Sequence, residues 1–167
     1  EALAVLEQAI LRNPYQHEFY TTAASLQLKL NREQDAERNL REAAALEPDL
    51  SSIHLALGNL LLKQGRFEEL VAYIADRAEQ EDNDPQYNWL LAASHNALEE
   101  YDSANKEYMA AYPHFDDNES FLLEYAAFLR EEGNWEKLSE VIHQGLALYP
   151  ANIELLQLHD DLHDSDQ

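Results

Sequence analysis

The stretch that decides the fold is SSIHLALGNLLLKQGRFEELVAYIADRAEQEDND, residues 51–84. Its first half has apolar residues at helical spacing, and Ser51 and Ser52 are candidates for the capping position. Gly65 predicts the end of this helix, because the residue that closes a helix often needs a positive φ. A second apolar stripe of helical period follows in residues 67–78, and a polar segment closes the stretch. The stretch therefore predicts two helices joined by a short turn.

The same pattern recurs every 34 residues without insertion or deletion. Three of its columns are Ala24, Gly58, Ala92 and Ala126; Ala36, Leu70, Ala104 and Leu138; and Leu40, Ile74, Tyr108 and Ile142. The predicted organisation is the second helix of an incomplete repeat (1–16), four repeats (17–50, 51–84, 85–118 and 119–152), and a C-terminal capping helix with a frayed tail (153–167). Helices of about 14 residues are marginal alone in water, so we expect the pairs to stack on their neighbours.

These columns resemble the tetratricopeptide repeat (TPR) family. The matching residues are Leu57 and Gly58 in the second repeat, Tyr101, Ala104, Tyr108 and Ala111 in the third, and Gly133, Trp135, Gly145 and Pro150 in the fourth. The resemblance covers nearly the whole chain. It implies an all-α solenoid of antiparallel helix pairs, wound into a right-handed superhelix of about four repeats plus flanking helices. We expect the chain to be a fragment of a larger TPR protein.

Several residues depart from the family pattern. Arg77 stands where a small residue is usual, so its head must reach water or a carboxylate such as Asp76 or Glu81. His54 and Asn88 occupy a column that usually holds a large apolar residue. In the third repeat, Pro113 predicts that the second helix ends near Tyr112.

The resemblance further implies a non-catalytic scaffold for protein–protein interaction, which binds a peptide or protein segment in a concave groove lined by the first helices. The predicted groove residues are Ser25, Leu28, Leu55, Asn59, Leu62, Trp89, Asn96, Leu123 and Arg130. For Trp89 the alternative is packing against the next helix, as aromatic residues at helical spacing usually do. The cations that family members use to clamp a chaperone's C-terminal carboxylate are missing at the corresponding positions, so we exclude that partner.

The chain is strongly acidic, with 33 Asp and Glu against 11 Lys and Arg and a formal net charge of −22. This charge repels phosphate backbones and anionic lipid, so nucleic acid and polybasic membrane binding are excluded. A field of this sign attracts a basic or basic and apolar partner, although charge runs are most often solvated helix faces. No apolar run approaches about 18 residues, so we expect no membrane span.

The sequence shows no nucleophile elbow, phosphate-binding loop or dinucleotide-binding glycine pattern, and it contains no Cys. We therefore predict no catalytic residue, no cofactor and no enzyme activity. His159 and His163 share a helix face at a spacing of four residues, but we expect no metal site there.

Two alternative functions stay open. One is a structural array that self-associates through its terminal helices, using Leu6, Ala9, Leu155 and Leu156. The other is the regulatory arm of a larger enzyme. The absence of Cys and of a leader segment leads us to expect a cytoplasmic location.

Overall fold

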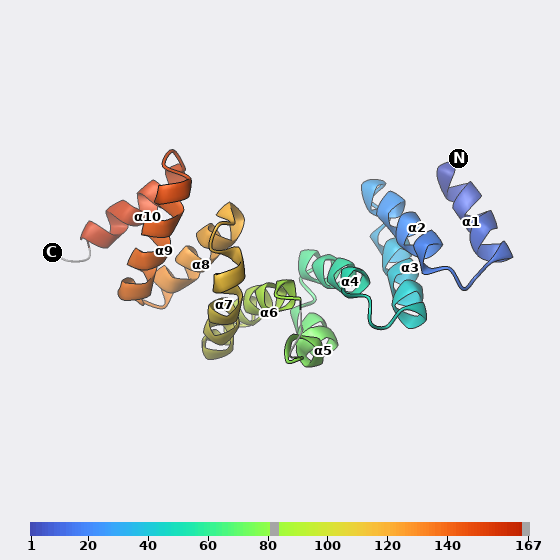
Figure 1. Cartoon of the computed structure of the whole chain (residues 1–167), viewed down its shortest axis with the longest axis horizontal. Coiled ribbons are helices and arrows are strands. Elements are labelled where there is room, and N and C mark those ends of the chain that lie inside the picture. The colour runs from blue at the N-terminus through green and yellow to red at the C-terminus, as the bar shows by residue number, and fades with distance from the viewer. Residues whose placement is uncertain (81–83, 165–167) are drawn as a thin grey trace. The chain divides into compact units, whose positions relative to one another are not determined.

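The computed structural model describes residues 1–80 and 84–164, with side chains described up to residue 162. These residues form ten helices and no strand (Figure 1). The helices are α1 (Ala2–Arg12), α2 (His17–Lys29), α3 (Glu33–Leu46), α4 (Ser51–Lys63), α5 (Phe67–Ala78), α6 (Gln86–Ala97), α7 (Tyr101–Phe115), α8 (Glu119–Glu131), α9 (Trp135–Leu148) and α10 (Ile153–Asp164). The predicted fold class, an all-α solenoid of antiparallel helix pairs, is confirmed.

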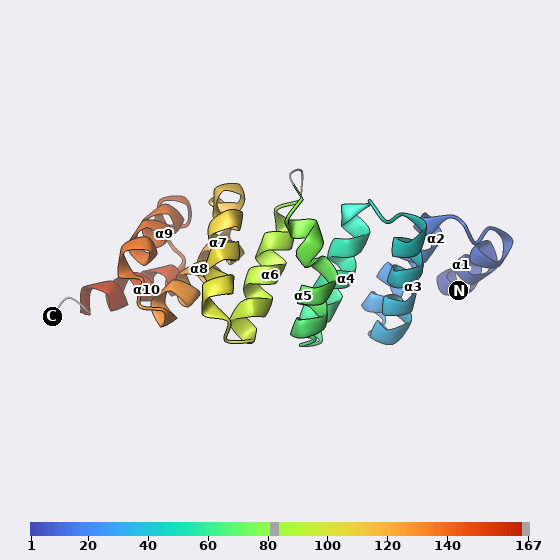
Figure 2. The same ribbon diagram turned by 90° about the horizontal axis from the view of Figure 1, so that it is seen from below.

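The chain divides into two compact units, which we call the N-terminal unit (Glu1–Leu90) and the C-terminal unit (Leu91–Gln167). In the N-terminal unit each of the helices α1 to α4 packs against the helix that follows it. Figure 2 shows α4 and α5 lying side by side as one such pair. In the C-terminal unit α7 packs on α8, α8 on α9 and α9 on α10, and α10 also contacts α8.

Four helix ends share one turn geometry at a 34-residue spacing. Asn31, Gly65, Glu99 and Gly133 have φ values of 57°, 70°, 60° and 69°. In each turn the next residue donates its N–H to a carbonyl five residues earlier, as in the bond of 3.0 Å from Arg66 to Leu61. This is the Schellman motif, which satisfies carbonyls at the end of a helix. The predicted end of the helix at Gly65 is confirmed.

The repeating columns form the core of each unit. All four members of the column Ala36, Leu70, Ala104 and Leu138 are 0% exposed. Gly58 is buried where helices approach closely, because a Cβ there would lie 3.0 Å from Leu90 Cδ1. Small residues in its column therefore reflect limited space between helices.

Two local predictions are wrong. Ser51 and Ser52 lie inside α4, since Leu50 already has the extended conformation of a cap residue and no side chain caps the helix. Helix α7 continues through Pro113 to Phe115 instead of ending near Tyr112. A proline in the last turn removes only one backbone hydrogen bond, whereas the extra turn brings the Phe115 ring to 5.5 Å from that of Phe121.

Candidate functional site

Six of the predicted groove residues lie on first helices of the N-terminal unit. Leu28 in α2, Leu62 in α4 and Trp89 in α6 are half-buried, so each keeps part of its apolar surface open to solvent. Leu55 is only 6% exposed, because it belongs to the core of this unit, and it offers a partner almost no surface. The half-burial of Trp89 is compatible both with contact to a ligand and with packing against the next helix.

The polar groove residues of the N-terminal unit are exposed, and both bond to their own helices. Ser25 Oγ donates to the carbonyl of Thr21 at 3.0 Å. Asn59 Nδ2 donates to the carbonyl of Leu55 at 2.8 Å. Their side-chain oxygens retain capacity to accept hydrogen bonds, as from the N–H groups of a peptide.

The other three predicted groove residues belong to the C-terminal unit. Asn96 in α6 and Leu123 in α8 are half-buried, while Arg130 near the end of α8 is exposed. Arg130 Nη1 lies 3.1 Å from Asp161 Oδ2 of α10. This exposed ion pair links α8 to α10. Ion pairs exposed to solvent stabilise a fold only weakly.

A polar cavity of about 420 Å³ lies in the N-terminal unit, beside the loop from α3 to α4 and the adjoining ends of α4, α5 and α6. It is lined by Pro48, Asp49, Ser51, His54, Asp76, Arg77, Gln80, Asp84 and Tyr87. One feature of the sequence pointed to this place, namely the polar residue His54 in a column that usually holds an apolar one.

His54 is buried in the wall of this cavity, with 2% of its surface exposed. Its Nδ1 lies 2.6 Å from the Tyr73 hydroxyl, and its Nε2 lies 2.7 Å from the Pro48 carbonyl oxygen. Burial lowers the pKa of His54, and the charge of Arg77 lowers it further. Arg77 itself donates to the Tyr73 carbonyl at 3.0 Å and lies 5.2 Å from the centre of the Tyr73 ring. Glu81, one of the carboxylates predicted to meet Arg77, is outside the described residues.

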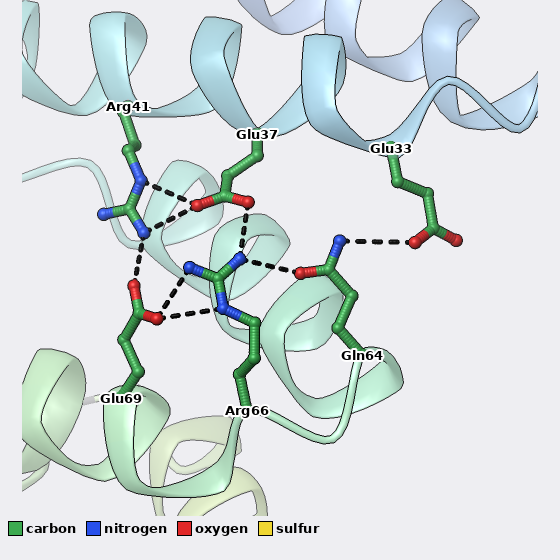
Figure 3. Close-up of polar contacts among 6 residues, drawn as sticks. All are labelled: Glu33, Glu37, Arg41, Gln64, Arg66 and Glu69. Carbon is green, nitrogen blue, oxygen red and sulfur yellow. Dashed lines mark hydrogen bonds and ion pairs between the residues drawn. The ribbon is translucent and has the colours of Figure 1, made fainter.

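A closed ring of four charged side chains joins the second helices of two successive repeats (Figure 3). Arg66 Nη1 donates to Glu37 Oε2 at 2.6 Å, and Arg66 Nη2 donates to Glu69 Oε2 at 2.6 Å. Arg41 Nη2 completes the ring with bonds of 2.8 Å to Glu37 and 2.6 Å to Glu69. Hydrogen bonds from Arg66, and secondarily from Arg41, hold the pKa of Glu37 below its usual range.

We call this set the ionic ring, and a neighbouring group of side chains extends it. Gln64 accepts a hydrogen bond from Arg66 Nη1 at 2.8 Å and donates to Glu33 at 3.2 Å. Lys63 Nζ also donates to Glu33, at 2.6 Å. The acidic and basic side chains of the ring pair with one another, so the ring links two successive repeats. Sequence reasoning missed it, although Glu33, Glu37 and Arg41 recur at four-residue spacing on one helix face.

The core of the C-terminal unit contains two buried tyrosines on neighbouring helices. Tyr108 of α7 donates its hydroxyl to Glu124 Oε1 at 2.8 Å, and its ring stacks on Tyr125 of α8 at a centroid distance of 5.1 Å. The Tyr125 hydroxyl is buried and has no hydrogen-bond partner among the described residues. Burial raises the pKa of Tyr125 to about 12. Both rings pack as core residues.

Residues 1–80 and 84–164 contain no group of three or more His, Cys, Asp or Glu side chains that could hold a metal ion. The side chain of His163, half of the predicted histidine pair, is outside the described residues, while the His159 ring lies 6.0 Å from that of His143. None of the helices described is both long and apolar enough to cross a membrane.

Known proteins share the repeat pattern of this chain. A family model described as YpiA-like, C-terminal tetratricopeptide repeats, matches residues 85–152. The chain is 32% identical over 156 residues to the TPR repeat-containing protein YpiA of Bacillus subtilis (strain 168), a match that covers 93% of this chain and 37% of YpiA. It is 37% identical over 68 residues to the Protein STIP1 homolog of Dictyostelium discoideum, covering 41% of this chain and 12% of that protein. The chain thus spans well under two thirds of the length of either relative.

Solved structures of TPR proteins share the fold. YrrB, a TPR protein with an unusual peptide-binding site, matches with a TM-score of 0.76 at 16% identity, over 95% of this chain and 82% of YrrB. MamA from Desulfovibrio magneticus RS-1 matches with a TM-score of 0.78 at 13% identity, over 91% of this chain and 86% of MamA.

Helix pairs repeating every 34 residues, with a small-residue column and a Schellman turn, define a TPR solenoid. The family model, the relative YpiA and the shared fold together support a protein of the tetratricopeptide-repeat family. Within that family it is similar to YpiA-like proteins. TPR proteins are in general non-catalytic repeat proteins, and their fold is that of a scaffold for protein–protein interaction.

Proposed function

We propose that the chain binds a peptide or protein segment against its first helices. In the N-terminal unit the binding face consists of Leu28, Leu62 and Trp89, flanked by Ser25 and Asn59; we call it the first-helix face. In the C-terminal unit the residues that contact the bound segment are Asn96, Leu123 and Arg130. The modules of this scaffold are the four predicted repeats, 17–50, 51–84, 85–118 and 119–152.

One observation carries this proposal: three successive first helices each keep a large apolar side chain half-buried. Leu28, Leu62 and Trp89 are neither core residues nor fully solvated, and a partner that covers them removes apolar surface from water. Trp is enriched among the residues that dominate binding energy. The peptide-binding site of YrrB gives a precedent within the same fold.

The charge of the C-terminal unit favours a basic or basic and apolar partner. Residues 91–167 contain seventeen acidic residues and only three cations. Each cation has an acidic neighbour within the unit: Lys106 lies 3.2 Å from Glu107, Arg130 3.1 Å from Asp161, and Lys137 2.8 Å from Glu140. The remaining acids create a field that speeds the approach of a cationic segment.

Peptides selected from a displayed random library on the whole chain provide the test. We expect enrichment of peptides that combine Lys or Arg with apolar residues, and anisotropy titrations of one such peptide should show about tenfold weaker binding to Trp89→Ala. Met109→Ala is the matched control, since Met109 is an exposed apolar residue of the second helix α7. Equal affinity of Trp89→Ala, Leu62→Ala and wild type, with circular dichroism showing all three folded, would refute the binding face.

Self-association through the terminal helices is a second candidate, favoured by their exposed apolar side chains. No residue of α1 is buried, and Val5 and Leu11 are 66% and 75% exposed. On α10, Ile153 is 69% exposed and the predicted Leu156 is 42% exposed, whereas the predicted Leu155 is 0% exposed and belongs to the core. Sedimentation equilibrium distinguishes the candidates: concentration-dependent dimers that Leu11→Ser and Ile153→Ser abolish support self-association, and a monomer at all concentrations rejects it.

A further inference from the structure

His54 joins three segments of the N-terminal unit through a single buried ring. It belongs to α4, its Nδ1 bonds to Tyr73 on α5, and its Nε2 bonds to Pro48 in the loop that follows α3. Both bonds are short, at 2.6 and 2.7 Å, and the imidazole is 2% exposed. A polar group buried in this way contributes to stability only while its hydrogen bonds are made.

The two partners determine which tautomer the neutral ring adopts. A carbonyl oxygen can only accept, so Nε2 must carry a hydrogen and donate it to Pro48. Nδ1 then accepts the hydrogen of the Tyr73 hydroxyl, and the neutral imidazole is fully satisfied. Protonation would place a second hydrogen on Nδ1, require the Tyr73 hydroxyl to turn, and leave a positive charge in a site shielded from water.

The surroundings of His54 contain charges of both signs. The titratable and charged groups that face it or its partners are Asp49 in the loop after α3, Tyr73, Asp76 and Arg77 on α5, Asp84 before α6, Tyr87 on α6, and, acting on Tyr73, Arg41 of α3. Asp49 and Asp76 are exposed, so water screens their attraction for an imidazolium. Arg77 is half-buried and repels it. The pKa of His54 is lowered overall, so burial and Arg77 outweigh the carboxylates.

We propose that His54 is a pH-sensitive latch, which is closed while the ring is neutral and loosens the junction of α4 with Pro48 and Tyr73 when the ring is protonated. Helix α4 also carries Asn59 and Leu62, so loosening this junction weakens binding at the first-helix face; that consequence alone rests on the proposed function.

The direction of the pH dependence follows from the lowered pKa. A histidine has a pKa of about 6.5 in an unfolded chain, and that of folded His54 is lower. The stabilisation by His54 is therefore fully present above about pH 6.5 and declines as the pH falls toward the folded pKa, because the unfolded state takes up the proton first. The pKa of Glu37 in the ionic ring is lowered, so this carboxylate titrates at lower pH and does not obscure the range.

Long-range ¹H–¹⁵N spectra of the imidazole rings test the latch without any ligand. We expect His54 to show the Nε2–H tautomer and to titrate below about pH 6.5, the usual midpoint of a histidine. Tyr73→Phe should raise the His54 midpoint, because it removes the donor to the neutral ring, whereas Tyr101→Phe on the exposed face of α7 should leave it unchanged.

Urea unfolding at about pH 7.5 and about pH 5.5 gives the second measurement. When the pH is lowered from about 7.5 to about 5.5, the unfolding equilibrium constant should rise in the wild type. This rise should be several-fold larger than the rise in His54→Gln. A His54 midpoint at or above about pH 6.5 would overturn the latch even if His54→Gln failed to fold. An intact latch with no pH effect on peptide binding would reject only the coupling to the first-helix face. Absence of any peptide binding would instead refute the proposed function and leave the latch standing.

Discussion

Replacement of Glu99 by glycine should stabilise the protein. Glu99 adopts a left-handed φ of 60° in the turn that Gly65 and Gly133 occupy in the repeats before and after it. A residue with a Cβ loses about 1–2 kcal/mol in this conformation, and the greater freedom of glycine in the unfolded chain offsets about 0.5–1 kcal/mol of the gain. Because the Glu99 side chain is exposed, we expect a net increase of about 0.5–1 kcal/mol in the free energy of unfolding.

The reciprocal substitution isolates the conformational contribution. A Cβ built on Gly133 would lie 3.9 Å from its nearest neighbour, Trp135 Nε1, so Gly133→Ala introduces no clash. It should lower the free energy of unfolding by about 0.5–1 kcal/mol, because the backbone strain exceeds the stabilisation gained by restricting the unfolded chain. Urea titrations followed by circular dichroism measure both changes.

Glu99→Ala is the control for the Glu99 side chain and its negative charge, since it removes both and keeps the Cβ. If Glu99→Gly were no more stable than Glu99→Ala, the left-handed turn would not carry the strain that we assign to it.

Further predictions concern the ionic ring and the aromatic core. A double-mutant cycle of Glu37→Gln and Arg66→Gln should give a coupling of about 0.2–1 kcal/mol that shrinks in about 1 M NaCl; additive effects would contradict the ring. Because the pKa of Glu37 is lowered, its stabilisation is present above the unfolded pKa of about 4.3 and is lost as the pH falls through the folded value. Urea unfolding of Glu37→Gln should accordingly depend less on pH in that range than the wild type. Tyr125→Phe should keep or raise the free energy of unfolding, by up to about 1–2 kcal/mol, because it removes a buried hydroxyl without a described partner; a clear loss would reveal such a partner.

The sequence predicted the fold well because equivalent positions of successive repeats have the same packing environment, so the pattern is visible several times. Leu70 and Ala104 differ in size, yet both are 0% exposed because they occupy the same column. The left-handed turn at Glu99 could not be predicted from the residue type, because glutamate does not favour this conformation. Only its position in the repeat, equivalent to Gly65 and Gly133, indicates it. The prediction that α7 ends near Tyr112 was wrong because a proline disrupts a helix less when it lies in the last turn, as Pro113 does.

The candidate site was less predictable. Leu55 and Leu62 are identical residues two turns apart on α4, but one is core and the other half-buried, because burial depends on the neighbouring helices. Glu37 and Arg66 meet across 29 positions of sequence, and no periodicity marks that contact. His54 could be noticed as a polar residue in an apolar column, whereas its bonds to Tyr73 and Pro48 required the structure.

Methyl NMR of the whole chain during titration with a selected basic peptide tests peptide recognition by the first helices most directly. We expect the largest shift changes at the Leu28 and Leu62 methyl groups, accompanied by the Trp89 indole. The methyls of Met109 and Leu148, exposed on the second helices α7 and α9, should change little. Shift changes concentrated on Met109 and Leu148, with Leu28 and Leu62 unaffected, would contradict binding at the first-helix face.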